Sequence, residues 1–382
     1  MPDDQTVTAP RRHSPGIELA GYLEAAVGAG EAARRYLGAL RAVHARVRAR
    51  DIPLPGRDSA MAPQARGRRV GLHRTRFNLL CLNPEQLVPY LASPNAPTCR
   101  GRRTIGLWNW EVDVIPAGWV AAAREVDEIW ASSEFTARHI RAVTDTPVLG
   151  LLLPLATGSA ARAPAPQAPS AFRVLVMFDY LSTLERKNPL GAIAAYRQAF
   201  GPGDGAQLIV KSMNGVHRPE RRAEVERAAA GRDDIVLRDE TISSVARDAL
   251  VASCDCLLSL HRSEGFGLGL AEAMAAGKPV VATAYGGNVE FMNASNSYLV
   301  PYELTRVGAG CEHYPPDAIW AQPSVEQAAS ALREIFAQRQ RSHDRAQRGR
   351  ADVRSLLAPE RIGAQILDRL EVLAAGPTFT RR

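Results

Sequence analysis

The feature that most constrains the fold is an alternation of short apolar segments with helix-like segments along the chain. Short apolar runs bounded by turn residues are typical of buried parallel strands. Strands are predicted at 77–82, 104–107, 128–131, 148–152, 172–178, 207–210, 235–237, 256–260 and 279–282. Helices are predicted at 31–48, after Ser132 or Ser133, and at 189–200, 219–230, 243–252, 268–276, 325–336 and 359–374. This repetition indicates an α/β protein with doubly wound, Rossmann-like parallel sheets.

The alternation is interrupted once, between Pro154 and Ser170, by a stretch of mainly proline, alanine and small polar residues. Such a stretch packs poorly and is typical of a linker. We therefore expect a first domain at 1–155, a linker at 156–170 and a second domain at 171–358. The last helix, within 359–382, could pack back on the first domain. Ligands of doubly wound sheets bind at the carboxyl ends of the strands, so a site in the cleft between the domains is expected.

Composition excludes several classes of protein. The chain has 382 residues, 46% of them hydrophobic, which rules out a disordered chain, a collagen-like fibre and a disulfide-framed miniprotein. Its five cysteines include a C-x-C pair, Cys254 and Cys256, with no matching histidines, which favours reduced thiols over a zinc site. The N-terminus shows no apolar signal segment, and the apolar run Val148–Leu155 is too short to span a bilayer. These features predict a cytoplasmic protein that at most contacts the inner membrane face peripherally.

The basic residues are unevenly distributed. The segment from Arg34 to Arg76 contains 12 arginines and only two acidic residues, Asp51 and Asp58. This segment suits an anionic acceptor or a membrane face; the alternative is a solvated arginine-rich surface. No nucleic-acid motif accompanies it, so a nucleic-acid partner is not expected. Only three of the 47 basic residues are lysines, namely Lys187, Lys211 and Lys278.

The segment from Leu260 to Met292 is the most informative for function. A loop with three glycines leads from a predicted strand into a predicted helix, which offers free N–H groups to a phosphate. Glu264 lies in the loop and Glu272 on the helix. Carboxylates bind phosphate poorly but accept hydrogen bonds from sugar and ribose hydroxyls. The combination indicates a nucleotide sugar, although glycine-rich turns of this kind are also common in other sites.

The sequence SEGFGLGLAEAMAAGKPVVAT resembles the donor-site signature of retaining glycosyltransferases of the GT-B fold, specifically glycosyltransferase family four, the group 1 glycosyl transferases. The resemblance is firm over about 172–340 and looser over 1–150. It implies two Rossmann-like domains facing across a cleft. It also implies that Glu264 contacts the transferred sugar near its reacting carbon and that Glu272 binds the ribose. Backbone N–H groups would hold the sugar and diphosphate at Gly265, Phe266, Gly267 and Leu268.

A second motif, FDYLSTLERKNP, spans Phe178–Pro189. In the family this loop supplies a basic pair for the donor diphosphate, and Lys187 matches the lysine. Phe178 and Asp179 stand where the family has a glycine–arginine pair, so Arg186 or Lys211 is expected to substitute. Glu240 would flank the base. For Arg186–Lys187, Lys211 and Glu240 alike, the alternative is a surface charge.

The first domain carries weaker signals. The segment GAGEAAR, with Gly28, Gly30 and Glu31, resembles the glycine loop of the family that faces the donor phosphate and the acceptor. Trp110 is a candidate platform for stacking a sugar, and Glu111 a candidate contact for a hydroxyl. Trp110 could equally be a packing residue, and the histidine that many relatives have near this point is absent.

The resemblance implies a retaining, metal-independent hexosyltransferase of carbohydrate or natural-product biosynthesis. Its co-substrate would be a nucleoside-diphosphate sugar, a UDP- or GDP-sugar by family habit, with no separate cofactor and no metal site. The acceptor would be a small molecule, a glycan or a lipid-linked compound. Two alternatives remain at this point: a nucleotide-sugar epimerase of the same fold, and a non-catalytic sugar-binding protein. The sequence leaves the acceptor, the linkage and the oligomeric state open.

Overall fold

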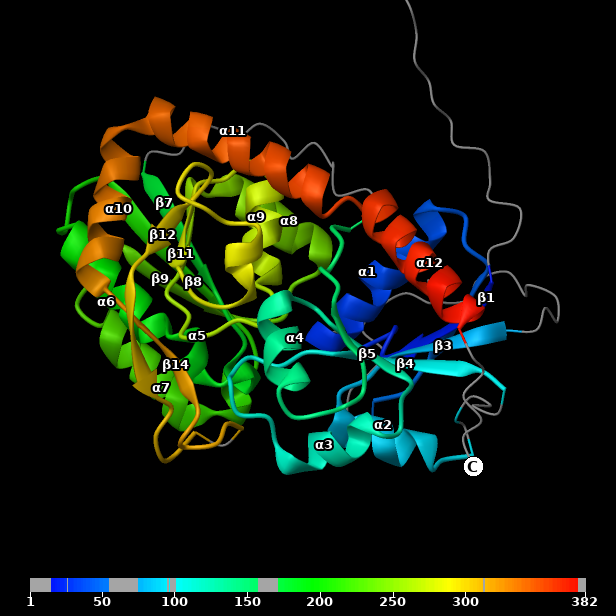
Figure 1. Ribbon diagram of the computed structural model, residues 1–382. Coiled ribbons are helices and arrows are strands. Elements are labelled where there is room, and N and C mark those ends of the chain that lie inside the picture. Colours follow the sequence, from blue (N-terminus) through cyan, green and yellow to red (C-terminus); the bar gives the residue numbers. More distant parts are fainter. Residues whose placement is uncertain are drawn as a thin grey trace, which may run out of the picture.

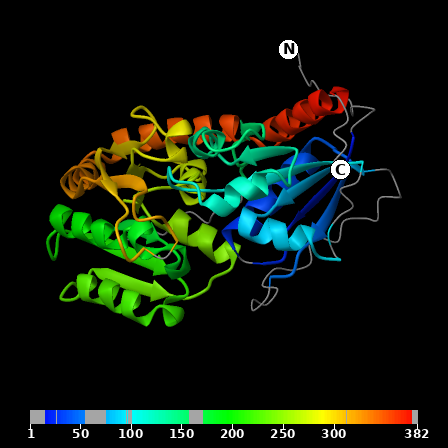
Figure 2. The same cartoon turned by 60° about the horizontal axis from the view of Figure 1, so that its bottom comes forward.

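The computed structural model describes residues 15–25, 27–54, 75–94, 96, 101–156, 171–311 and 313–376. Two six-stranded sheets, each parallel throughout, form the centres of two domains, which lie side by side (Figures 1 and 2). The prediction of two doubly wound α/β domains is therefore confirmed. The linker predicted at 156–170 and the arginine-rich segment lie partly outside the described residues, at 157–170 and at 55–74.

The first sheet has the strand order β2-β1-β3-β4-β5-β6. Its strands are β1 (Gly16–Gly21), β2 (Val47–Asp51), β3 (Thr75–Cys81), β4 (Arg103–Trp108), β5 (Glu128–Ala131) and β6 (Val148–Gly150). Its helices are α1 (Gly28–Ala42), α2 (Pro84–Leu91), α3 (Ala117–Ala123) and α4 (Glu134–Arg141). The chain passes from β1 outward to β2 and then returns to β3 on the other side. The order of connection thus reverses between β1 and β3, where open sheets of this kind bind ligands.

The second sheet has the order β12-β11-β10-β7-β8-β9. Its strands are β7 (Phe172–Met177), β8 (Ala206–Ser212), β9 (Ile235–Asp239), β10 (Cys256–Ser259), β11 (Val280–Thr283) and β12 (Tyr298–Val300). Its helices are α5 (Leu184–Lys187), α6 (Pro189–Ala199), α7 (Pro219–Ala229), α8 (Ser244–Ser253), α9 (Leu268–Ala275) and α10 (Val325–Ala337). Short 3-10 turns lie at Tyr180–Ser182, Gly215–His217 and Gly287–Glu290. Here the reversal falls between β7 and β10, so the loops after these two strands meet at one point.

A pair of strands and a pair of helices complete the fold. The antiparallel strands β13 (Tyr302–Arg306) and β14 (Ile319–Pro323) extend from the second domain. Helix α11 (Arg339–Leu356) runs along the second domain, and α12 (Pro359–Ala375) then lies beside α1 (Figure 1). Gly363 of α12 lies so close to Ala39 that an added Cβ would be 2.3 Å from the Ala39 carbonyl oxygen. The last helix therefore packs on the first domain.

The predicted helix at 31–48 is wrong at both ends. The helix starts at Gly28 and ends at Ala42, and β2 starts at Val47. His44 has a positive φ of 55°, a backbone conformation that cannot continue a helix. Ser133, rather than Ser132, caps α4, since its hydroxyl accepts a bond from the Thr136 N–H at 3.1 Å. In the described ranges, no helix has the length and apolar character needed to cross a bilayer.

Candidate active site at the domain interface

A cleft of about 360 Å³ lies between the carboxyl ends of the two sheets. Its walls come from the loops after β1, β3 and β4 of the first domain and from those after β7 and β10 of the second. These include both points where the strand order reverses. The fold itself therefore places the loops of two distant sequence regions around one cavity.

A carboxylate and two cations meet in this cleft. Oε1 of Glu264 lies 2.5 Å from Nζ of Lys187 and 3.3 Å from Nη1 of Arg186. Burial opposes the charge of Glu264, but these two cations hold the pKa of its carboxyl at about 2. Burial, together with the neighbouring Arg186, lowers the pKa of Lys187 below its usual value. The structure thus brings together the glutamate and the basic pair of the two sequence motifs.

A strained connection holds the basic pair in place. The one-turn helix α5 that carries Arg186 and Lys187 lies between Thr183 and Asn188, which have φ values of 64° and 49°. Left-handed backbone costs a non-glycine residue about 1 kcal/mol or more. Asn188 also caps α6, and its amide donates to the Leu260 carbonyl at 2.8 Å. This bond ties the basic pair to the end of β10, just before the loop that carries Glu264.

The glycine-rich loop packs directly against the first domain. An added Cβ at Gly265 would lie 2.8 Å from the Trp110 carbonyl oxygen. The Ser133 hydroxyl donates to the Gly265 carbonyl. Gly267 has a φ of 91°, which a residue with a side chain rarely adopts, and α9 begins immediately after it at Leu268. The loop from Gly265 to Leu268 lines the cleft, although the Phe266 side chain is buried.

A second helix start lines the cleft from the opposite side. Gly28 begins α1 and borders the cavity, with open space where a Cβ would be. Gly30 does not border it, because it packs against the Tyr22 and Ala25 carbonyl oxygens at 2.4 and 2.7 Å from an added Cβ. Glu31 is engaged in ion pairs with Arg34 at 2.9 Å and Arg35 at 2.8 Å. Of the three residues predicted in this segment, only Gly28 faces the cavity.

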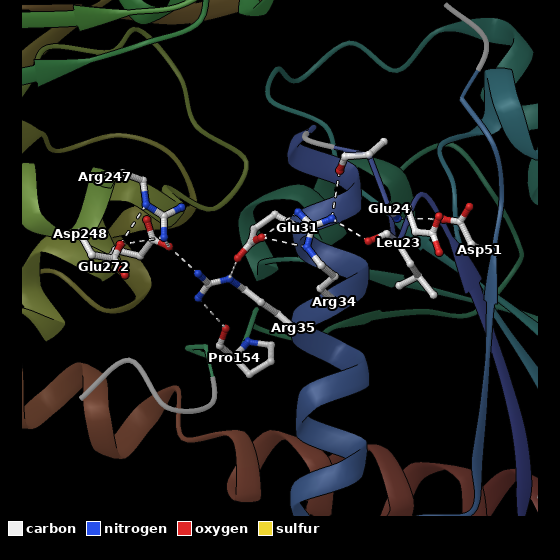
Figure 3. Close-up of polar contacts among 11 residues, drawn as sticks. Leu23, Glu24, Glu31, Arg34, Arg35, Asp51, Pro154, Arg247, Asp248 and Glu272 are labelled. Carbon is white, nitrogen blue, oxygen red and sulfur yellow. Dashed lines mark hydrogen bonds and ion pairs between the residues drawn. The ribbon is translucent and has the colours of Figure 1, made fainter. Parts of the chain in front are cut away.

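Glu272 is held by arginines of both domains (Figure 3). Arg35 of α1 and Arg247 of α8 both contact its Oε1, the latter at 3.2 Å. Burial raises the pKa of the Glu272 carboxyl, and the two arginines act against that effect. Glu272 lies one turn beyond Leu268, so the two residues share a face of α9.

Lys211 and Glu240 form a different contact from the one expected for ligand-binding side chains. Lys211 is buried, and its ammonium donates to the carbonyls of Ser212 at 2.6 Å and Glu240 at 2.5 Å. The Glu240 side chain is exposed. Lys211 therefore fixes the loop after β9, and a direct role of either residue in donor binding stays a prediction.

Trp110 is buried in an aromatic cluster. Its ring centroid lies 4.9 Å from that of Trp119 and 5.4 Å from that of Tyr314, and its indole N–H donates to the Val114 carbonyl at 3.0 Å. This geometry favours packing over sugar stacking. Glu111, in contrast, lines the cleft, with Oε1 4.0 Å from Arg186 and Oε2 accepting a bond from the Tyr314 hydroxyl at 3.1 Å.

A family model matches part of the second domain. Residues 192–307 match the model of the family described as glycosyl transferases group 1. The matched residues include both Glu264 and Glu272. A search of curated proteins finds no match by sequence.

Solved structures extend the likeness to the whole chain. HepE from Anabaena, in complex with UDP-glucose, is 16% identical with a TM-score of 0.64, and the match covers 94% of this chain and 99% of that one. Sucrose-phosphate synthase from Thermosynechococcus elongatus is also 16% identical with a TM-score of 0.64, and the match covers 94% of this chain and 99% of that one. A glycosyltransferase from Rickettsia africae is 12% identical with a TM-score of 0.66, covering 95% of this chain and 100% of that one. These matches show that the two domains form the GT-B fold.

Several residues that lie around the predicted site residues were not identified from the sequence. Arg35, Arg247 and Tyr314 contact predicted site residues, and His261 is fully buried behind the glycine-rich loop, 3.2 Å from the Asn288 side chain. The spacing of Glu31 and Arg35 suits an ion pair on one helix face, which is the only local signal for Arg35. Among the described residues, no cluster of three or more His, Cys, Asp or Glu side chains has an arrangement that could hold a metal ion.

Proposed function

We propose that the protein transfers a hexosyl group, with retention of configuration, from a nucleoside-diphosphate sugar to an acceptor hydroxyl. The observation that carries this proposal is that two basic side chains and two helix starts meet at the cleft. Lys187 and Arg186 meet there beside Glu264, and the first residues of α1 and α9 line the same cavity. A helix start presents unpaired N–H groups and the positive end of its dipole, which together favour a bound phosphate.

The charge arrangement suits departure of a diphosphate. As the bond to the anomeric carbon breaks, negative charge gathers on the leaving phosphate oxygen. In this proposal Lys187, Arg186 and the start of α9 stabilise that charge, so the protein supplies the positive charge without a metal ion. Glu264 would contact the sugar near the reacting carbon, while its ionised form keeps Lys187 in place.

The first domain would contribute the acceptor side. Glu111 is the first-domain carboxylate that lines the cleft, and 24% of its side chain is exposed. We propose that it accepts a hydrogen bond from an acceptor hydroxyl. The acceptor oxygen would attack the face from which the diphosphate leaves, and the departing phosphate oxygen would take the acceptor proton. The close packing of Gly265 on the first domain would limit access of water to the sugar.

A uridine or guanosine diphosphate hexose is the proposed donor. The complex of Anabaena HepE with UDP-glucose supports the uridine nucleotide. We propose a glycan, lipid-linked or natural-product acceptor, and a cytoplasmic location, in keeping with the free thiols of Cys81, Cys254, Cys256 and Cys311 in the described part of the chain. Contact with a membrane surface would follow from a lipid-linked acceptor.

The proposal is tested by incubating the purified protein with UDP- and GDP-hexoses and an acceptor panel. Formation of a glycosylated product and free nucleoside diphosphate is the expected result, and the product's anomeric configuration reports retention. Lys187→Met should lower kcat about 100-fold, which is typical for removal of one group that stabilises transition-state charge. Lys278→Met is the matched control, because Lys278 lies outside the cleft and donates to the Ala252 carbonyl. An epimerised sugar, or no turnover of any donor, would contradict the proposal.

A further inference from the structure

Glu272 is held from two domains at once. Within the described structure, its contacts fall on a single carboxylate oxygen, Oε1, which both Arg35 and Arg247 approach. Arg247 belongs to the same domain as Glu272, whereas Arg35 reaches it from α1 of the first domain (Figure 3). About a fifth of the Glu272 side chain is exposed, at 18%. The two arginines therefore fix the carboxylate by one oxygen and leave Oε2 to other donors.

Arg35 is itself rigidly held. Its side chain is 2% exposed, and its Nε donates to Oε1 of Glu31 at 2.8 Å. Its Nη1 donates to the Pro154 carbonyl at 3.3 Å, in the segment that leads out of the first domain. Arg34 binds the other oxygen of Glu31, which keeps that carboxylate oriented. To leave Glu272, this guanidinium would have to break its bonds to both Glu31 and Pro154, so its contact with Glu272 is set by the first domain.

We infer that Arg35 is a positioning residue for nucleotide recognition: it orients Glu272 across the domain boundary so that Oε2 accepts the ribose hydroxyls of the bound nucleoside diphosphate. This inference rests on the proposed function, because it takes a nucleotide as the ligand of this site. It adds that the ribose is recognised by a carboxylate whose orientation depends on the opposite domain.

This arrangement couples two events. A Glu272 carboxylate fixed by both domains presents Oε2 at one position, and separation of the domains removes Arg35 and leaves Arg247 as the arginine partner. The ribose hydroxyls then bind better when the domains are together. By linkage, the bound nucleoside favours the closed arrangement by the same factor. Donor binding would therefore help to assemble the site that the acceptor enters.

The test measures whether Arg35 acts through the ribose. Isothermal titration calorimetry gives the Kd of uridine and guanosine diphosphates and of their 2′,3′-dideoxy analogues for each variant. Arg35→Met should weaken binding of the ribonucleotide about 10-fold or more, as expected when a hydrogen bond to a charged group is impaired. It should change the Kd of the dideoxy analogue less than about 2-fold, because that analogue has no hydroxyls for Oε2. In a protein that already carries Glu272→Gln, adding Arg35→Met should not change either Kd further.

Arg41→Met is the matched control, since Arg41 is an exposed arginine in the last turn of the same helix. It should leave the ratio of the two Kd values unchanged. If Arg35→Met is poorly folded by circular dichroism, Arg35→Lys replaces it and should give a smaller change of the same kind. Equal weakening of both ligands, or no weakening of either, would overturn the inference. A wild-type protein that binds neither diphosphate would instead refute the proposed function.

Discussion

At the scale of single residues, the charges in the cleft are nearly balanced. Glu264 faces Lys187 and Arg186, and Arg186 also faces Glu111 at 4.0 Å. Arg186 and Glu264 are both largely buried, at 6% and 14% exposure of their side chains. Removing one member of such a group leaves an opposite charge with little solvent, which is costlier than the pair itself is stabilising. Each of these side chains therefore supports both the fold and the proposed reaction.

Glu264→Gln tests this balance through pH. The pKa of Glu264 falls from its ordinary value of 4.5 to about 2 in the folded protein. Its ionised form therefore stabilises the fold fully above about pH 4.5, and this contribution disappears as pH falls toward 2. At pH 7 the variant should be less stable by up to about 3 kcal/mol, because Arg186 and Lys187 lose their counter-ion. Urea unfolding of both proteins between pH 7 and pH 3 measures the difference.

The difference in the free energy of unfolding between the wild type and Glu264→Gln should be constant from pH 7 to pH 5 and should shrink below pH 4.5. Glu134→Gln is the control, since the exposed pair of Glu134 with Arg141 at 2.7 Å contributes about 1 kcal/mol or less. A Glu264→Gln difference as large at pH 3 as at pH 7 would show that Glu264 is not the titrating group.

The proximity of Glu264 and Lys187 was predictable from local sequence motifs. Glu264 and Lys187 follow strands on either side of the point where the strand order reverses, so two short motifs suffice to bring them together. The partner of Glu272 was not predictable, because Arg35 is 237 positions away and is one arginine among many. Trp110 shows another limit: an aromatic residue after a strand looks the same whether it stacks on a sugar or packs, and only its neighbours decide.

At the scale of elements, two glycines at the start of α1 differ in role: Gly30 is a packing residue, and Gly28 borders the cleft. Gly30→Ala should lower the free energy of unfolding by about 1–3 kcal/mol, because its methyl group would lie within 2.7 Å of two backbone carbonyls. Gly28→Ala should be neutral or slightly stabilising, since nothing lies within 4 Å and alanine favours helix. Urea midpoints compare the two variants. An equal loss of stability in both variants would mean that the close packing at Gly30 does not contribute to the effect of the substitution.

Most strands with an apolar pattern were predicted, and several elements that are short or carry charged residues were missed. The strands β3 to β11 lie at or near their predicted positions, whereas β1, β2 and β12 to β14 were not predicted. Glu18 of β1 is fully buried, and Arg50 of β2 pairs with it at 2.5 Å. Taken singly, each charge argues for an exposed segment. The pairing of Glu18 with Arg50 and with Arg102, at 3.5 Å, makes this buried charge acceptable in a sheet. Helix α11 was missed for a related reason, because its buried face consists mainly of small residues: Ser342, Ala346, Gly349 and Val353.

At the scale of the whole molecule, two contacts made by the last part of the chain add to those at the cleft. One is the packing of α12 on α1. The other lies between the first domain and the segment around β13 and β14, where Tyr314 contacts Trp110 and the Ile319 N–H donates to Asp113 at 2.7 Å. The first domain is thus completed by residues from the end of the chain. The return of the last helix to the first domain was expected, but no local sequence pattern marks the contact around β13 and β14.

The contact of α12 with β5 gives the last prediction. Glu128 is 1% exposed, and Arg369 of α12 binds both of its oxygens, at 2.9 and 2.6 Å. Arg369→Met should destabilise the protein by about 2–4 kcal/mol, somewhat less than for a fully buried pair because a third of the Arg369 side chain is exposed. Adding Glu128→Gln should restore part of the loss, since a neutral amide can still accept the Trp130 indole bond.

Urea unfolding followed by tryptophan fluorescence measures this cycle, because Trp108, Trp119 and Trp130 lie in the core of the first domain. Arg361→Met, an exposed arginine on the same helix, should change stability by less than about 0.5 kcal/mol. If the two substitutions at Arg369 and Glu128 were simply additive, the pair would not be coupled. A positive coupling would instead mean that the C-terminal helix supplies the counter-charge for the first sheet, so that the first domain cannot reach full stability until the chain is complete.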